Sequence, residues 1–188
     1  MKWILLAFLA LASGCVEGYP IRDVALRIGF ASGGLCSATA VSDDVLLSAA
    51  HCFKDDRLTS INGQPAYALK LVNDGHDHVL VRVSRKFKHW TRIGPEPVQG
   101  QHVRFIGQPA GLDFVYREVY VAQVTADEIL YDGNSFAGDS GSGFMDAQGR
   151  VVGVLTGSKA YRTNSGFTFA LVWSKRLRFS AAELRDMR

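Results

Sequence analysis

Two short segments of the chain carry the residue types that nucleophilic catalysis requires. Residues 47–52 read LSAAHC and contain His51, and residues 138–143 read GDSGSG and contain Ser140. A serine hydroxyl is a weak nucleophile until a neighbouring imidazole accepts its proton, and a carboxylate must hold that imidazole in the correct tautomer. Glycines beside a serine let the backbone approach a bound molecule closely. These residues can act together only if the fold brings the two segments close to each other.

The composition excludes several classes of protein. The chain has 188 residues, of which 47% are hydrophobic and 21% are charged. These values are ordinary for a folded soluble protein and exclude a disordered chain, a collagen-like fibre and a coiled coil. The length fits one domain or two small barrels. The net charge of +3 is too weak and too diffuse to indicate a nucleic-acid partner.

The first residues are typical of an export signal. Lys2 precedes an uncharged run over residues 3–15, whose apolar part, residues 3–12, is half as long as the roughly 20 residues that a membrane-spanning helix needs. We predict a signal peptide over residues 1–14. The small residues before Cys15 look like a bacterial lipobox, which would make Cys15 a lipidation site and a membrane anchor. Cleavage after Ala12, in an A-x-A pattern, is the alternative. The protein would be periplasmic, an outer-membrane-anchored lipoprotein, or secreted.

Three cysteines are an odd number, and export changes how they are interpreted. Outside the cytosol, cysteines form disulfides. Assigning Cys15 to the signal boundary leaves Cys36 and Cys52 as a pair. A disulfide between them would stabilise the fold by roughly 3 kcal/mol in the chain-entropy model. The sequence alone also allows other pairings.

The rest of the chain has the pattern of an all-β protein. Short runs rich in Val, Ile, Leu, Phe and Tyr are broken by Gly, Asp, Asn and Pro, and this spacing favours a sandwich or barrel. Residues 93–101 hold two prolines and two glycines within or beside them and form the best candidate linker. Ser180 and Glu183 form a capping box, which predicts a short C-terminal helix. The predicted strands are 24–30, 37–41, 45–48, 67–72, 78–83, 103–107, 114–124, 151–155 and 167–173.

The two segments resemble the signatures of the trypsin/chymotrypsin-like serine endopeptidases, small-A-A-H-C and G-D-S-G-G. The resemblance extends from about Val24 to the terminal helix, with Ser142 standing where the family has glycine. It implies an all-β, chymotrypsin-like fold of two six-stranded antiparallel β-barrels with a short C-terminal helix. Residues 15–92 would form the first barrel and residues 102–188 the second.

The resemblance also implies a role for each residue of the two segments. His51 would be the general base and Ser140 the nucleophile. The amides of Gly138 and Ser140 would form the oxyanion hole, which stabilises charge that develops on the reacting carbonyl. The family pairs the cysteine after its histidine with one sixteen positions earlier, which matches Cys52 and Cys36.

The carboxylate that completes the triad must lie between the two segments. Asp77 fits best, because it begins the alternating run 77–83, as the aspartate of the family begins a strand. Asp74 is the competitor. His76 and His78 would share one face of a strand, but two ligands without a third are a weak metal signal. We predict no metal site and no cofactor.

The pocket and the activation step follow from the same resemblance. Asn134 stands six residues before the nucleophile, at the base of the primary specificity pocket, where trypsin-like enzymes have an aspartate. Residues 156–158 (Thr156, Gly157 and Ser158) and Gly166 would form its walls, so the sequence favours an uncharged P1 residue. The chain lacks an Ile-Val-Gly-Gly activation motif. We therefore expect Asp139 to find a basic or backbone donor within the fold.

Together these patterns predict a monomeric endopeptidase that hydrolyses polypeptides through an acyl-enzyme. Two alternatives stay open on the sequence alone. One is a catalytically silent binding module on the same fold. The other is a self-processing protease or an esterase.

Overall fold

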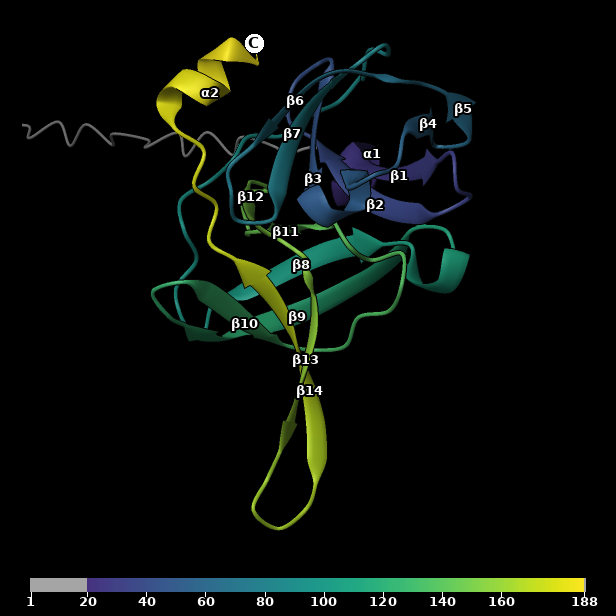
Figure 1. Ribbon diagram of the computed structural model, residues 1–188. Coiled ribbons are helices and arrows are strands. Elements are labelled where there is room, and N and C mark those ends of the chain that lie inside the picture. The colour runs from purple at the N-terminus through teal and green to yellow at the C-terminus, as the bar shows by residue number, and fades with distance from the viewer. Residues whose placement is uncertain (1–19, 188) are drawn as a thin grey trace, which may run out of the picture.

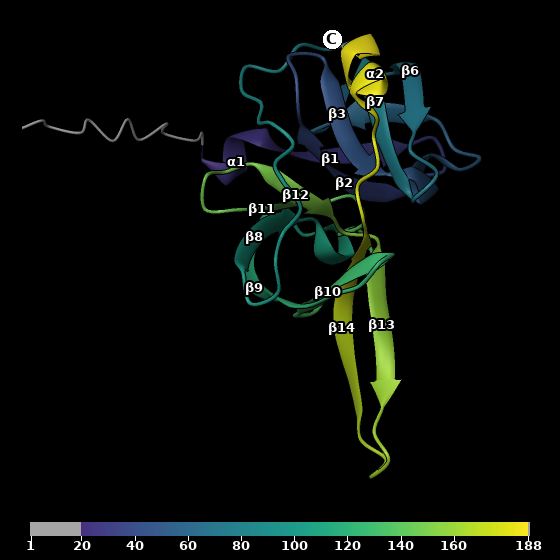
Figure 2. The same ribbon diagram turned by 90° about the vertical axis from the view of Figure 1, so that its left-hand side faces the viewer.

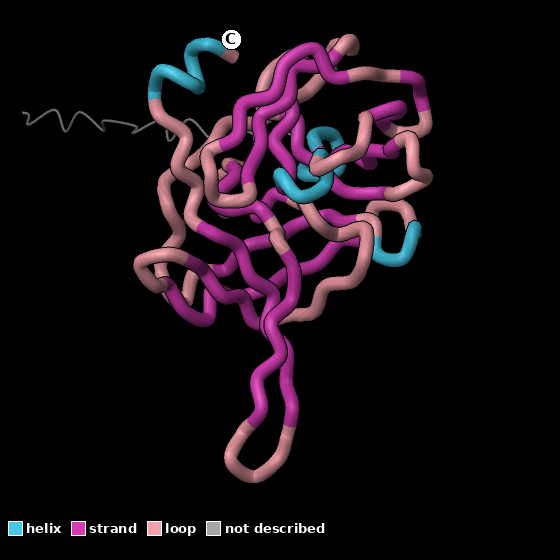
Figure 3. The backbone as a smooth tube through the Cα atoms, in the orientation of Figure 1, coloured by secondary structure: helices cyan, strands magenta, loops and turns pink. Residues whose placement is uncertain are grey.

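The computed structural model describes residues 20–187, and β-strands account for most of its regular structure (Figures 1 and 3). The strands form two curled antiparallel sheets, each of seven strands. The expectations for the signal peptide over residues 1–14 and for Cys15 lie outside the described residues. Of the helices in residues 20–187, none is long and apolar enough to cross a membrane.

The first sheet is built from the amino-terminal half of the chain, and its strand order is β5-β4-β1-β2-β3-β7-β6. All of its neighbouring strands pair antiparallel. β3 pairs with β2 on one side and with β7 on the other, and β7 also pairs with the terminal strand β6. The strands are β1 (Ala25–Phe30), β2 (Leu35–Ala40), β3 (Val45–Ala49), β4 (Leu58–Ile61), β5 (Gln64–Pro65), β6 (Ala68–Asn73) and β7 (His78–Val83).

The second sheet has the order β12-β11-β8-β9-β10-β14-β13. Numbered from its own first strand, this order is the same as that of the first sheet, so one topology occurs twice. The strands are β8 (His102–Gly107), β9 (Val115–Val124), β10 (Glu128–Asp132), β11 (Gly143–Met145), β12 (Val151–Val154), β13 (Gly157–Arg162) and β14 (Thr168–Lys175).

The predicted chymotrypsin-like, all-β class is confirmed, but the prediction of six strands in each half is wrong, because each sheet has seven. The additional strands are short. β5 has two residues and β11 has three, so neither is long enough to show the alternation by which a strand is recognised in a sequence. The segment between the two sheets runs from residue 84 to residue 101 and includes the predicted linker, 93–101.

Each sheet encloses its own apolar core, and a third apolar cluster joins the two halves. Ile28 and Leu46 lie in the first core, and Phe105 and Phe144 lie in the second. The third cluster packs strands of both sheets against each other and against the C-terminal segment. Because this cluster is shared, the relative position of the sheets is set by close packing. Its buried members are Val24, Val45, Leu47, Leu80, Met145, Val151, Val154 and Met187.

The helices are short and lie outside the sheets. They are α1 (Ile21–Val24), the 3₁₀ turns η1 (Ala50–Phe53) and η2 (Pro109–Gly111), and α2 (Ala181–Asp186). The predicted C-terminal helix is confirmed. Ser180 accepts a hydrogen bond from the Glu183 N–H, and the Glu183 carboxylate accepts one from the Ser180 N–H, which completes the capping box.

One element leaves the body of the molecule. The hairpin of β13 and β14 begins inside the second sheet and projects into solvent, as both orientations of the ribbon show (Figures 1 and 2). β13 is the terminal strand of its sheet, so β14 is its partner on one side, and no strand of residues 20–187 pairs with its other side.

Candidate active site

His51 is placed by the end of β3. The strand runs through Ala49, and the chain then enters the 3₁₀ turn η1, whose second residue is His51. β3 pairs antiparallel with β7, with Ala49 opposite His78. The end of β3 therefore lies beside the start of β7, which is where Asp77 stands. The pairing of two strands brings together residues that are 26 positions apart.

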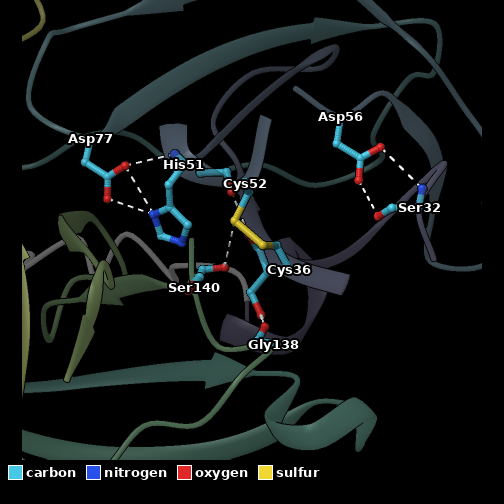
Figure 4. Close-up of a disulfide and its surroundings, with 10 residues drawn as sticks. Ser32, Cys36, His51, Cys52, Asp56, Asp77, Gly138 and Ser140 are labelled. Carbon is cyan, nitrogen blue, oxygen red and sulfur yellow. Dashed lines mark hydrogen bonds and ion pairs between the residues drawn. A yellow bond between two sulfur atoms is a disulfide. The ribbon is translucent and has the colours of Figure 1, made fainter. Parts of the chain in front are cut away.

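Asp77 binds both the backbone and the side chain of His51. One carboxylate oxygen accepts the His51 N–H at 2.8 Å, and the other lies 2.9 Å from His51 Nδ1 (Figure 4). The Asp77 side chain is 17% exposed, whereas that of His51 is 43% exposed. Burial raises the pKa of the Asp77 carboxyl, but the hydrogen bonds and the charge of His51 outweigh burial and hold that pKa below its usual value. Asp77 is therefore an anion beside an accessible imidazole.

Asp74, the competing carboxylate, has a different partner. Its side chain and that of His78 are both fully buried, and Asp74 Oδ2 lies 2.7 Å from His78 Nδ1. Asp74 also accepts the backbone N–H groups of His76, at 2.8 Å, and Arg178, at 3.1 Å. The turn before β7 thus supplies the aspartates of two Asp–His pairs, and the pair formed by Asp77 and His51 is the more exposed one. In the part of the chain that the structure describes, no cluster of three metal-ligating side chains is present.

The loop that carries Ser140 is fastened to the first sheet. Ser140 O accepts the Ser37 N–H from β2 at 2.8 Å, and Ser37 Oγ donates to Gly138 O at 2.8 Å. Ser140 lies on the side of the imidazole away from Asp77 (Figure 4). Within residues 20–187 its hydroxyl makes no hydrogen bond to His51. Catalytic hydrogen bonds are often long in unliganded proteins and tighten when substrate binds.

Gly138 and Gly141 allow this loop to approach the first sheet. Their φ angles are +99° and +90°, in the region that favours glycine. A Cβ on Gly138 would overlap Gln108 O, and one on Gly141 would overlap Ser37 O. Among the described residues, the N–H groups of Gly138 and Ser140 have no backbone acceptor. They are the two donors that the sequence assigns to an oxyanion hole.

A disulfide joins β2, which binds the Ser140 loop, to η1, which carries His51. Cys36 and Cys52 are bonded, as the sequence predicts. Cys36 precedes Ser37, which binds the Ser140 loop, and Cys52 follows His51. The disulfide therefore ties the support of the serine to the support of the histidine (Figure 4).

The carboxylate before the serine is neutralised inside the fold. The fully buried Asp139 pairs with Arg117 Nη2, and its second oxygen accepts the Phe136 N–H at 2.8 Å. Arg117 also donates from Nη1 to Asn134 O at 3.1 Å and lies over the Phe105 ring. The expected basic donor and backbone donor are both present. No new amino terminus is needed to balance the charge of Asp139.

The residues predicted to form the specificity pocket fall into two groups. Ser158 contacts Ser135, the neighbour of Asn134, with a distance of 2.6 Å between the two Oγ atoms. Thr156 and Gly157 lead directly into Ser158 at the start of β13. Gly166 instead occupies the turn of the projecting hairpin. Six strand residues separate the start of β13 from this turn, a distance of about 20 Å, so Gly166 cannot wall the same pocket.

An open hollow lies beside His51 on the side of the first sheet. Its volume is about 510 Å³, and its lining is largely apolar. Leu71 from β6 and Phe53 from η1 are among the apolar residues that line it. The hollow would let an extended molecule pass the imidazole. It is lined by Ala50, His51, Phe53, Lys54, Leu71, Asn73, Gly75, Asp77 and Val79.

Sequence reasoning missed Arg117, although the sequence contains a signal for it. In β9, residues 117, 119 and 121 share one face, and the other two are buried valines. A cation on an apolar face needs an anionic partner. Ser37 and Ser135 carried no comparable signal, because their roles depend on which strand or loop lies opposite.

Comparison with known proteins agrees with this geometry. The model of the trypsin-like peptidase domain family matches residues 36–154, which is more than half of the chain. The chain therefore belongs to the trypsin-like peptidase family. A search of curated protein sequences returns no match.

Solved structures share the fold at low sequence identity. A serine-to-alanine mutant of Rv3671c from M. tuberculosis H37Rv, in its inactive form, superposes with a TM-score of 0.67 at 16% identity, over 89% of this chain and 87% of that chain. A Glu endopeptidase gives 0.65 at 14% identity, over 89% of each chain. An inactivated protease paralogue of the scabies mite gives 0.62 at 14% identity, over 91% of this chain and 97% of that chain. At such identities the likeness extends to the fold alone.

Proposed function

We propose that the protein is a serine endopeptidase that cleaves polypeptides through an acyl-enzyme. The observation that carries this proposal is the bond from His51 Nδ1 to the buried carboxylate of Asp77, with Ser140 on the other side of the ring. This bond holds the proton on Nδ1 and leaves Nε2 free to act as a base.

The mechanism uses each of these residues in turn. Ser140 Oγ attacks the peptide carbonyl while His51 Nε2 takes its proton, and Asp77 stabilises the imidazolium. The N–H groups of Gly138 and Ser140 bind the oxyanion, and His51 returns the proton to the leaving amine. Water then attacks the Ser140 ester with His51 again as the base. No step requires a cofactor.

The contacts around Ser158 support a small, uncharged P1 residue. Ser158 and Ser135 are hydrogen-bonded across the space between β13 and the Ser140 loop. Val172, the cross-strand neighbour of Ser158, is fully buried on the same face. The two serine side chains are uncharged and bridge the two segments, so we expect them to leave room for a small side chain only. We expect alanine at P1 to be cleaved faster than arginine or phenylalanine in otherwise identical peptides.

Labelling with a fluorophosphonate tests the proposal. We expect the probe to modify the wild type at Ser140 and to leave Ser140→Ala unmodified. Ser142→Ala is the matched control, because its hydroxyl lies two residues away, is buried and should not contribute to labelling. If folded wild type does not react, the chain is a silent binding module and the proposal fails. If it reacts but cleaves no peptide library, it is an esterase or a self-processing protease.

We also propose that the protein is exported and held at a membrane by a lipid on Cys15. The support is the sequence of residues 1–15 and the disulfide, which requires an oxidising compartment. Incorporation of radiolabelled palmitate should occur in the wild type and be lost in Cys15→Ala. Retained incorporation in that variant would place the lipid on another residue and overturn the assignment to Cys15. No incorporation in the wild type would instead favour a secreted protein.

A further inference from the structure

The projecting hairpin of β13 and β14 has one apolar face. Side chains two residues apart in a strand share a face, and so do cross-strand partners. Tyr161 and Phe169 are partners and Phe167 lies two residues before Phe169, so these three rings share one face. Leu171 and Trp173 continue that face toward the body of the sheet. The other face of the outer hairpin carries the small or polar residues Ala160, Arg162, Thr168 and Ala170.

The apolar face is most exposed at the far end of the hairpin, residues 161–169, which we call the hairpin tip. Phe167 is 75% exposed, the highest value for any large hydrophobic residue within residues 20–187, and Phe169 is 48% exposed. The rings of Phe169 and Tyr161 stack, with centroids 5.4 Å apart. An exposed apolar cluster of this kind indicates a surface that contacts a membrane or another protein.

The charge of this region is positive. Residues 147–182 contain six lysines and arginines and no aspartate or glutamate. Some of these cations pair with acids from other segments, as Lys159 does with Glu128 of β10. Arg162, the one charged residue of the hairpin tip, is exposed and makes no ion pair within residues 20–187. The tip therefore combines exposed aromatic rings with a cation that can bind an external anion.

The size of the tip favours a lipid surface over a protein partner. An aromatic side chain has about 150–250 Å² of surface, so the exposed parts of the three rings offer roughly 300 Å². A stable protein interface buries about 800 Å² on each partner. A bilayer needs no matching shape, because aromatic rings insert at the level of its headgroups and cations bind its anionic phosphates. A flat surface can also meet the projecting hairpin without meeting the body (Figures 1 and 2).

The backbone of the tip limits how deeply it can enter a bilayer. Unpaired N–H and C=O groups find no partner in the hydrocarbon core, so turns and open strand edges stay outside it. The turn, residues 163–166, is polar, and Thr163 Oγ1 accepts the Phe167 N–H at 3.0 Å. The rings would therefore lie at the boundary between headgroups and acyl chains, roughly 5–10 Å deep.

We propose that the hairpin tip docks on the surface of a bilayer that contains anionic lipid. Phe167 and Phe169 enter the interface, and the Arg162 guanidinium, at the same level of the hairpin, binds lipid phosphate. This contact is separate from the lipid proposed on Cys15. Two membrane signals hold a protein more firmly than one, and two points of attachment also restrict how its body is oriented.

Vesicle binding measures the proposed contact. The protein used begins near residue 16, which removes the predicted signal peptide and Cys15 but keeps all of residues 20–187. We expect it to bind vesicles of phosphatidylcholine with about 30% phosphatidylglycerol about fivefold more tightly than pure phosphatidylcholine. Phe167→Ser should weaken binding about tenfold, because the buried ring is lost. Arg162→Gln should remove most of the preference for anionic vesicles.

Two exposed residues in the first half of the molecule give matched controls. Tyr67 is 60% exposed, and Arg57 is also exposed. Tyr67→Ser and Arg57→Gln remove a ring and a cation outside the hairpin, so both variants should bind vesicles as the wild type does. A wild type that does not bind, or equal weakening by Tyr67→Ser and Phe167→Ser, would overturn the proposal. Equal binding to both kinds of vesicle would overturn anionic lipid as the partner.

A second measurement uses the exported protein with any lipid that it carries. Phe167→Trp adds a fluorophore at the tip, and brominated lipids quench a tryptophan that enters a bilayer. We expect the emission added by Phe167→Trp to be quenched and that added by Tyr67→Trp to persist. If neither is quenched, the tip stays in water and the proposal is wrong, whatever the serine variant does.

Further outcomes separate this inference from the proposed function. Ser140→Ala should bind vesicles as tightly as the wild type, so the docking can hold even if the peptidase proposal fails. Without vesicles, Phe167→Ser should label with fluorophosphonate and cleave peptides at the wild-type rate. Slower cleavage of long peptides alone would make the tip a substrate contact. A wild-type dimer that Phe167→Ser converts to monomer would assign the tip to a second copy of the chain. Either result would overturn membrane docking.

Discussion

Asp77 and Asp74 lie three residues apart on one turn but serve different partners. Asp77 bonds the exposed His51, and Asp74 bonds the buried His78. We expect Asp77→Asn to fold normally and to lower kcat about 10⁴-fold, because the imidazole would adopt the wrong tautomer. Asp74→Asn should retain at least about a tenth of wild-type kcat when folded, because Asp74 does not touch His51. Peptide hydrolysis and thermal unfolding of both variants measure the contrast, and equal kcat losses would contradict these assignments.

The buried pair also predicts a pH dependence of stability. Burial raises the pKa of the Asp74 carboxyl, but hydrogen bonding to His78 and its charge outweigh burial, so the pKa lies below its usual 3.8. A lowered pKa in the folded state means that the stabilisation is complete above about pH 5 and is lost as pH falls through the folded pKa. Asp74→Asn should cost about 2 kcal/mol at pH 7 and much less near pH 2. Urea unfolding at both pH values tests this, and a pH-independent difference would contradict it.

At the scale of elements, β9 contacts the active-site loop through the ion pair between Arg117 and Asp139. Arg117→Ala would leave the buried Asp139 carboxylate without its charged partner and would lower the free energy of unfolding by about 3–5 kcal/mol. The loop would then hold the N–H groups of Gly138 and Ser140 less firmly in position. We expect slower fluorophosphonate labelling of the folded variant. Arg150→Ala is the control, because Arg150 binds the equally buried Asp146 through a 2.8 Å hydrogen bond. It should lose stability but label at the wild-type rate, and slowed labelling in both would remove the special role of Arg117.

The disulfide connects two elements that each carry part of the site. Replacing Cys36 and Cys52 by serine should lower the free energy of unfolding by about 3 kcal/mol, because the unfolded chain gains freedom. Labelling of the folded variant should also slow, since β2 holds the Ser140 loop and η1 holds His51. Calorimetry and labelling rates measure the two effects. If the labelling rate did not change, the disulfide would contribute to stability but not to the geometry of the active site.

The strands that the sequence predicted and those that it missed differ in a physical way. Long alternating runs such as β9, and buried runs such as β7, were predicted within one or two residues of their bounds. β4, β5, β10 and β11 were missed, and each has two to five residues. β3 and β12 are of similar length but were predicted, so a strand this short shows too little of the alternating pattern to be recognised reliably. β13 was missed because its sequence, GSKAYR, is polar, as suits a strand with one partner and one open edge.

At the scale of the whole molecule, one strand order occurs twice and the site lies where the two copies meet. His51 and Asp77 come from the first sheet, Ser140 comes from a loop of the second, and apolar packing sets the contact between the sheets. The motifs named these residues in advance. Three further residues, Arg117, Ser37 and Ser135, position the site through contacts between distant segments of the chain. A local sequence pattern does not predict such contacts.

This architecture also bears on activation. Because Asp139 already has Arg117 and a backbone N–H as partners, the protein should be active without a cleavage that creates a new amino terminus. Purified protein beginning near residue 16 should label with fluorophosphonate at once, and controlled cleavage near Ile21 should not raise the rate. An increase on cleavage would show that a new amino terminus is required after all.

The most direct test of the central claim is to trap the acyl-enzyme. Wild type is mixed with an alanine-based peptide ester, quenched in acid and examined by intact mass and peptide mapping. The proposed mechanism predicts a mass increase equal to the acyl group, located on Ser140 and absent from Ser140→Ala and His51→Ala. Turnover with no adduct, an adduct on another residue, or no reaction by folded wild type would contradict it.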